Sequence, residues 1–97
     1  MRHFFRSRLT SHDVLERADA FFPTVGLTAS ATAAQSRTFS GALGVMQLSV
    51  KAEGGHYTFV EVLTDQMGES RMDRNVKRFF VLLHRVEEPR HQLEAAY

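Results

Sequence analysis

The sequence of 97 residues contains no cysteine, no tryptophan and only two prolines, and it has no long apolar run. The lack of cysteine excludes disulfide scaffolds, cysteine-ligated zinc sites and thiol catalysis. No apolar stretch reaches the about 7–15 residues of a signal peptide or the about 20 residues of a membrane span. We therefore expect a protein of the cytoplasm that does not contact a membrane.

An excess of charge of one sign is also absent. The chain carries 12 basic and 11 acidic side chains, for a net charge of +1, and this balance excludes a whole-molecule field that gathers nucleic acid. Its 43% hydrophobic and 24% charged residues are typical of a folded globular domain. The length fits one α+β domain, which we place at residues 1–88, followed by a polar tail over residues 89–97.

The motifs that carry catalysis are missing. The five histidines lack the spacing of a helical metal site and are expected on the surface, and neither a nucleophile elbow nor a phosphate-binding loop occurs. Acidic residues cluster near residues 65–73, where helix capping explains them better than acid–base chemistry. We predict no catalytic residue, no metal and no cofactor, and therefore not an enzyme.

Two helices are indicated by apolar residues at helical spacing behind capping residues. Thr10, with Asp13 three residues later, predicts the start of the first helix, and Pro23 predicts its end near Phe22. Ser70 predicts the start of the second helix, again with an aspartate three residues later. The expected buried stripes are Val14, Leu15, Ala18, Phe21, Phe22 and Val25 in the first helix, and Met72, Val76, Phe79, Phe80 and Leu83 in the second.

Strands are indicated before the first helix and between the two helices. Residues 3–9 read as a short strand, and residues 27–40 read as one long strand or as two. Residues 45–51 and 56–64 form a predicted β-hairpin around Gly54-Gly55. The predicted fold is β-α-β-β-β-α, an antiparallel sheet with two helices packed on one face.

The strand over residues 56–64 carries apolar residues on both of its faces. Tyr57, Phe59 and Leu63 alternate with Val60 and Val62, and two helices cover only one face of a sheet. Exposed apolar surface on a small protein marks an interface. The first functional hypothesis is therefore a homodimer, or a subunit of a larger complex, that associates through an exposed sheet face or through the edge strand 28–34.

The second hypothesis is a pocket for a small apolar ligand between the sheet and the C-terminal helix. Its polar centre is Glu61, which is either solvated on a sheet face or buried with Arg37. The residues predicted to line this pocket are Arg37, Phe39, Met46, Leu48, Tyr57, Phe59, Glu61, Phe80 and His84.

The third hypothesis is nucleic-acid binding through the polar side of the C-terminal helix. A stripe of cations lies opposite the apolar stripe, and such a stripe can contact phosphates. An ordinary solvated helix has the same pattern, which makes a nucleic-acid partner less expected than a protein. The residues of this stripe are Arg71, Arg74, Lys77, Arg78 and Arg85.

Overall fold

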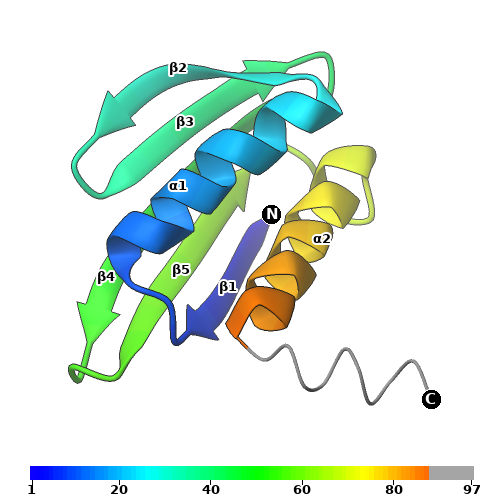
Figure 1. Cartoon of the computed structure of the whole chain (residues 1–97). Helices are drawn as coiled ribbons and strands as arrows, with labels where there is room; N and C mark the ends of the chain where they lie inside the picture. Colours follow the sequence, from blue (N-terminus) through cyan, green and yellow to red (C-terminus); the bar gives the residue numbers. More distant parts are fainter. Residues whose placement is uncertain (88–97) are drawn as a thin grey trace.

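The computed structural model describes residues 1–87, which form an antiparallel sheet covered on one face by two helices (Figure 1). The elements are β1 (Arg2–Ser7), α1 (Ser11–Phe21), the 3₁₀ turn η1 (Phe22–Val25), β2 (Leu27–Ala33), β3 (Ser36–Gly41), β4 (Gly44–Glu53), β5 (Tyr57–Thr64) and α2 (Arg71–Glu87). Across the sheet the five strands lie in the order β1-β5-β4-β3-β2. The predicted α+β class and the placement of both helices on one face are confirmed.

The segment 27–40 forms two strands, so the sheet has five strands. β2 and β3 pair antiparallel around a tight turn, with a register shift between Ala29 and Ala31. β2 is an outer strand of the sheet, as predicted for residues 28–34, and all of its residues after Leu27 are exposed. The exposure follows from the position of β2 at the edge of the sheet, where it packs on β3 and η1.

The first helix begins and ends where its sequence signals lie. The side-chain oxygen of Thr10 accepts a hydrogen bond from the backbone N–H of Asp13 at 3.1 Å. α1 ends at Phe21, and Pro23 occupies the first turn of η1, where its missing N–H costs no hydrogen bond. Gly26 then adopts a φ of +87°, which turns the chain from the helix layer into β2.

The β4–β5 hairpin fixes which side chains face the helices. Gly54 and Gly55 both have positive φ in the turn between the strands. The pairing sets Leu48 opposite Val62 and Val50 opposite Val60, and all four side chains are buried under the helices. Their neighbours along each strand face the opposite side, because successive side chains of a strand alternate.

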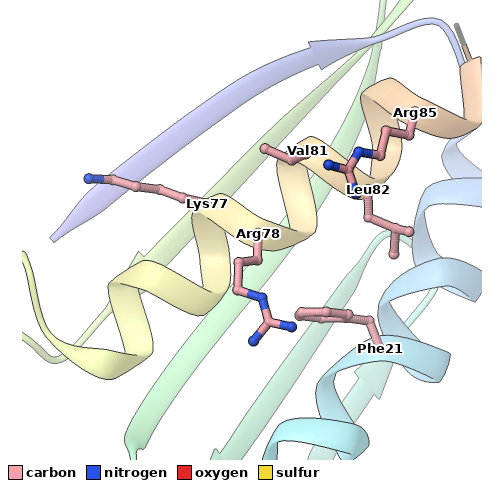
Figure 2. Close-up of a pocket in the computed structure, with 6 residues that line it drawn as sticks. All are labelled: Phe21, Lys77, Arg78, Val81, Leu82 and Arg85. Atoms are coloured by element: carbon pink, nitrogen blue, oxygen red, sulfur yellow. The ribbon is translucent and has the colours of Figure 1, made fainter. Parts of the chain in front are cut away.

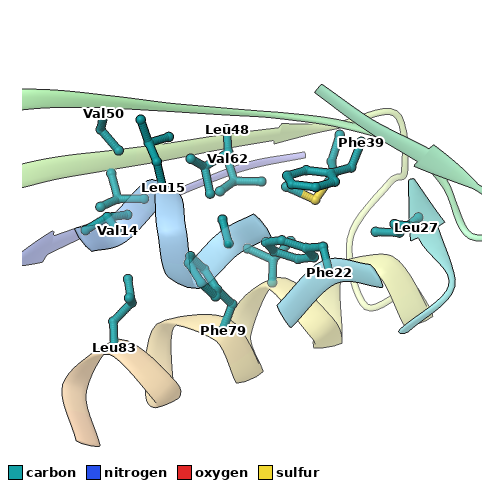
Figure 3. Packing of buried hydrophobic residues seen from close by; sticks show 14 of the residues in the cluster. Val14, Leu15, Phe22, Leu27, Phe39, Leu48, Val50, Val62, Phe79 and Leu83 are labelled. Carbon is teal, nitrogen blue, oxygen red and sulfur yellow. The ribbon is translucent and has the colours of Figure 1, made fainter. Parts of the chain in front are cut away.

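One core lies between the sheet and the helix layer (Figure 3). Both predicted helix stripes contribute to it, although Phe21, Val25 and Phe80 are only partly buried. The side-chain oxygen of Ser70 accepts from the backbone N–H of Asp73 at 3.1 Å, which confirms the predicted start of α2. The predicted tail over 89–97 lies outside the described residues.

Candidate functional site

The sheet face opposite the helices carries the largest group of exposed apolar side chains. Seven large hydrophobic residues are exposed in residues 1–87, and four of them point from this open face of the sheet. These are Phe4 (55% exposed), Val45 (45%), Tyr57 (45%) and Leu63 (43%). The open face therefore presents apolar surface from three adjacent strands, β1, β5 and β4.

Aromatic rings form the centre of the open face. The Phe4 and Phe59 rings stack with their centroids 5.9 Å apart. The guanidinium of Arg2 lies 5.5 Å from the centre of the Phe4 ring, and that of Arg6 lies 5.3 Å from the centre of the Phe59 ring. Such contacts hold the arginines flat against the sheet and leave a mixed aromatic and guanidinium surface.

Opposite charges are paired within the same surface. The Nε of Arg2 donates to Glu61 at 2.6 Å, and the Nε of Arg6 donates to Glu53 at 2.9 Å. With Lys51 on β4, the face carries three cations and two anions. It therefore has no strong field of one sign to select an acidic or a basic partner.

Of the two alternatives predicted for Glu61, the structure has the one on a solvated sheet face and not the buried pair with Arg37. Arg37 lies opposite Leu48, which lies opposite Val62, so Arg37 is on the helix side of the sheet. Its Nε donates to Asp19 of α1 at 3.1 Å. Glu61 is on the other face, where Arg2 is its partner. The two residues fall on opposite faces because strand register, which the sequence alone does not specify, sets which side each one takes.

The nine residues predicted to line an apolar pocket do not come together. Phe39, Met46 and Leu48 are fully buried in the core. Phe80 stacks on Phe5 at 5.3 Å and so is occupied by β1. His84 lies on α2, 3.8 Å from Glu87. The remaining four are the pair Arg37 and Glu61, already placed on opposite faces, and Tyr57 and Phe59, which lie on the open face with Glu61.

The five cations of the predicted nucleic-acid stripe all belong to α2, and they differ in their surroundings. Lys77 reaches Glu69 at 3.4 Å, and Arg74 donates to the backbone carbonyl of Glu69 at 3.3 Å. Arg78 and Arg85 line a groove beside Phe21, at the end of α1 (Figure 2). The stripe is therefore divided between the first turns of α2, which hold Arg71 and Arg74, and the groove.

A buried polar cluster joins β1, β5 and α2, and it was not predicted. Nε2 of His3 lies 2.7 Å from Oδ1 of Asp73, and both side chains are buried, so the expectation of surface histidines is wrong for His3. Asp73 also accepts from Thr64 Oγ1 at 2.9 Å, from Ser70 Oγ at 2.6 Å and from the backbone N–H of Gly68 at 3.1 Å. With four donors, its carboxylate is satisfied inside the protein, so we assign the cluster to stability.

The cluster predicts a dependence of stability on pH. Burial alone raises the pKa of Asp73, but hydrogen bonds from Ser70, His3 and Thr64 outweigh it and lower the pKa from 3.8 to about 2. A carboxyl whose pKa is lower in the folded state contributes stability above its unfolded pKa and loses it as the pH falls toward the folded pKa. We expect this contribution, about 2 kcal/mol, to disappear between about pH 4 and pH 2.

Urea unfolding at about pH 5 and about pH 2 measures this loss in the wild type and in Asp73→Asn. The other carboxyl groups titrate in both proteins, so the wild type should lose about 2 kcal/mol more than the variant. Equal losses in the two proteins contradict the assignment to Asp73.

No protein-family model matches the chain, and a comparison with curated proteins finds no match. Within residues 1–87, no group of three His, Asp or Glu side chains is placed to hold a metal ion. No helix in that part of the chain has the length and apolar character to cross a membrane.

The contribution of β1 to the open face was not predicted from the sequence. It consists of Arg2, Phe4 and Arg6. Alternation along β1 does place Phe4 on the opposite side of the strand from His3 and Phe5. However, adjacent phenylalanines left the inward side of β1 undecided, and only its pairing with β5 settles it.

Proposed function

We propose that this protein is a non-enzymatic association module that forms a homodimer through the open face of its sheet. One observation supports this most directly: four of the seven exposed large hydrophobic residues in 1–87 lie on that face, along β1, β5 and β4. Exposed apolar side chains gathered in one patch mark an interaction surface, whereas scattered ones do not. Aromatic and arginine side chains, which the centre of the face carries, are the types enriched at protein interfaces.

A second copy of the chain suits this face better than a partner of different chemistry. In a two-fold dimer the same patch meets itself, so each partner must carry both members of every complementary pair. The ion pairs of Arg2 with Glu61 and of Arg6 with Glu53 supply both signs on one surface. Two such faces can exchange these two ion pairs across the interface, while the third cation of the face, Lys51, is exposed on β4.

The size of the face is compatible with such a dimer. Five strands spaced by about 4.8 Å, each about seven residues long at about 3.3 Å per residue, give a flat area on the order of 500 Å². Projecting side chains enlarge the accessible area toward the about 800 Å² that one partner contributes to a standard interface. Two sheets stacked about 10 Å apart would bury the stacked Phe4 and Phe59 rings between them.

Leu63→Glu tests this interface. Leu63 is half-exposed on β5 between Arg2 and Gln47, so the substitution leaves the core intact. In the dimer it buries a carboxylate of each copy in the apolar interface, and we expect the dimer to dissociate at least about tenfold more readily. Sedimentation equilibrium of wild type and variant measures the change, and thermal unfolding followed by circular dichroism confirms the fold.

Val81→Glu is the matched control, because Val81 is equally exposed but lies on α2, away from the open face. It should dimerise like the wild type. A wild-type protein that sediments as the 11.0 kDa monomer at high micromolar concentration overturns the proposal. Equal effects of the two substitutions also overturn it.

A further inference from the structure

A groove on the helix side of the molecule is separate from the open face. It lies between the end of α1 and the middle of α2 and has a volume of about 390 Å³ (Figure 2). This is at the small end of the range of about 300–1,000 Å³ for ligand sites. Its lining residues are Phe21, Lys77, Arg78, Val81, Leu82 and Arg85.

Half of the lining is apolar. Phe21 packs edge-on against Phe22 at 5.1 Å but is only partly buried, and its ring lines the groove. Leu82 is partly buried, and Val81 is 48% exposed although it is a large apolar residue in the middle of a helix. These three side chains supply the apolar part of the lining, here called the apolar floor; Leu82 is directed toward Phe21, and Val81 lies on the outer side of α2 (Figure 2).

The other half of the lining is cationic, and the residues that the described part of the chain contributes include no acidic one. The guanidinium of Arg78 lies 5.9 Å from the centre of the Phe21 ring and donates to Asn75 at 3.2 Å. Among residues 1–87, no carboxylate forms an ion pair with Arg78 or Arg85. Lys77 is different, because it reaches Glu69 and extends away from Phe21 in Figure 2. Within residues 1–87, the guanidinium groups of Arg78 and Arg85 therefore flank the apolar floor without a carboxylate partner.

We propose that this groove binds a single-chain anionic amphiphile of the fatty-acid type. One of the two groove arginines, Arg78 or Arg85, would receive the carboxylate at one end of the floor, because a guanidinium presents paired N–H donors that match its two oxygens. The alkyl chain would lie over Phe21, Val81 and Leu82. The lining residues of α2 extend over nine positions, from Lys77 to Arg85, or about 12 Å, which is the scale of a medium-length alkyl chain.

The combination of features favours this ligand over a nucleic acid. A phosphate backbone is bound by cations along its whole length, so Arg71 and Arg74 should matter as much as the groove arginines. A fatty acid carries one charge and a long apolar part, and it needs only the cations beside the apolar floor. The two proposals therefore differ in which arginines are required.

Isothermal titration calorimetry with dodecanoate, kept below its critical micelle concentration, tests the proposal. The wild type should bind one molecule per chain, and Arg78→Gln/Arg85→Gln should weaken binding at least about tenfold. Arg71→Gln/Arg74→Gln removes the same number of charges from the same helix outside the groove and should bind like the wild type. All four side chains are exposed, so the fold should persist in both double variants.

Two further probes distinguish the contribution of the carboxylate to binding from that of the alkyl chain. Butanoate, which keeps the carboxylate but lacks a long chain, and dodecyltrimethylammonium, which reverses the charge, should both bind much more weakly. The Val81→Glu variant should no longer bind dodecanoate. The Leu63→Glu variant should bind it like the wild type, because the open face is not involved. The groove proposal is thus independent of the dimer.

Several results would overturn the proposal. The absence of saturable dodecanoate binding is one, and equal weakening by the two arginine double variants is another, because it indicates a diffuse field along α2. Butanoate that binds as tightly as dodecanoate would show a simple anion site. Phosphatidylglycerol vesicles that bind the wild type while free dodecanoate does not would identify a membrane surface as the occupant.

Discussion

Replacing Asp73 with alanine is expected to destabilise the protein by about 3–5 kcal/mol. The Asp73 carboxylate is fully buried and accepts hydrogen bonds from His3, Thr64, Ser70 and the Gly68 backbone. Removal of the acceptor leaves these donors without their partner, and each buried donor that remains unsatisfied costs about 1–3 kcal/mol. Urea unfolding at neutral pH measures the loss, which is a large part of the about 5–15 kcal/mol available to a typical domain.

Two further variants make this result interpretable. Thr64→Val removes one donor and keeps the side-chain shape, so it should cost about 1 kcal/mol, and it should remain measurable if Asp73→Ala does not fold. Glu16→Ala alters an exposed carboxylate of α1 and should stay within about 0.5 kcal/mol of the wild type. A loss below about 1 kcal/mol for Asp73→Ala would show that the cluster contributes little to the fold.

The elements of the fold were predictable because each has a local signal. Thr10, Pro23 and Ser70 mark helix ends through backbone hydrogen bonds that involve only neighbouring residues. Alternation of Met46, Leu48 and Val50 gives the buried side of β4 directly. The division of residues 27–40 into β2 and β3 was left open, because the turn at 34–35 lacks the glycine, proline or asparagine that marks most turns.

The candidate site was predictable only within single elements. The outward side of β5, with Tyr57, Phe59 and Leu63, follows from its own alternation. The contribution of Phe4 depends on the pairing of β1 with β5, two strands far apart in the sequence, and the contact of His3 with Asp73 also joins residues 70 positions apart. No local pattern encodes such contacts, because they arise from the register of β1 on β5 and the docking of α2.

The groove was missed for a related reason. Helical periodicity assigns Phe21 to the apolar stripe of α1, and it does pack on Phe22 and Phe79. Periodicity does not predict the position of α2 relative to α1, and in the structure α2 covers only part of the Phe21 ring. Val81 and Leu82 lie beside the same gap, so the groove depends on how the two helices are spaced on the sheet.

Replacing Phe22 with alanine should also destabilise the protein by about 3–5 kcal/mol, because Phe22 joins three parts of the core. Its ring is fully buried, with centroids 5.1 Å from Phe21, 5.1 Å from Phe39 of β3 and 5.0 Å from Phe79 of α2. The cavity left by its removal borders both helices and the sheet, so no single element can move to fill it. Phe4→Ala removes an exposed ring of the open face. In the Leu63→Glu background, where the dimer is weakened, it should lower the free energy of unfolding much less than Phe22→Ala does. Urea unfolding of both substitutions in that background measures the contrast, and similar losses would show that the core is not organised around Phe22.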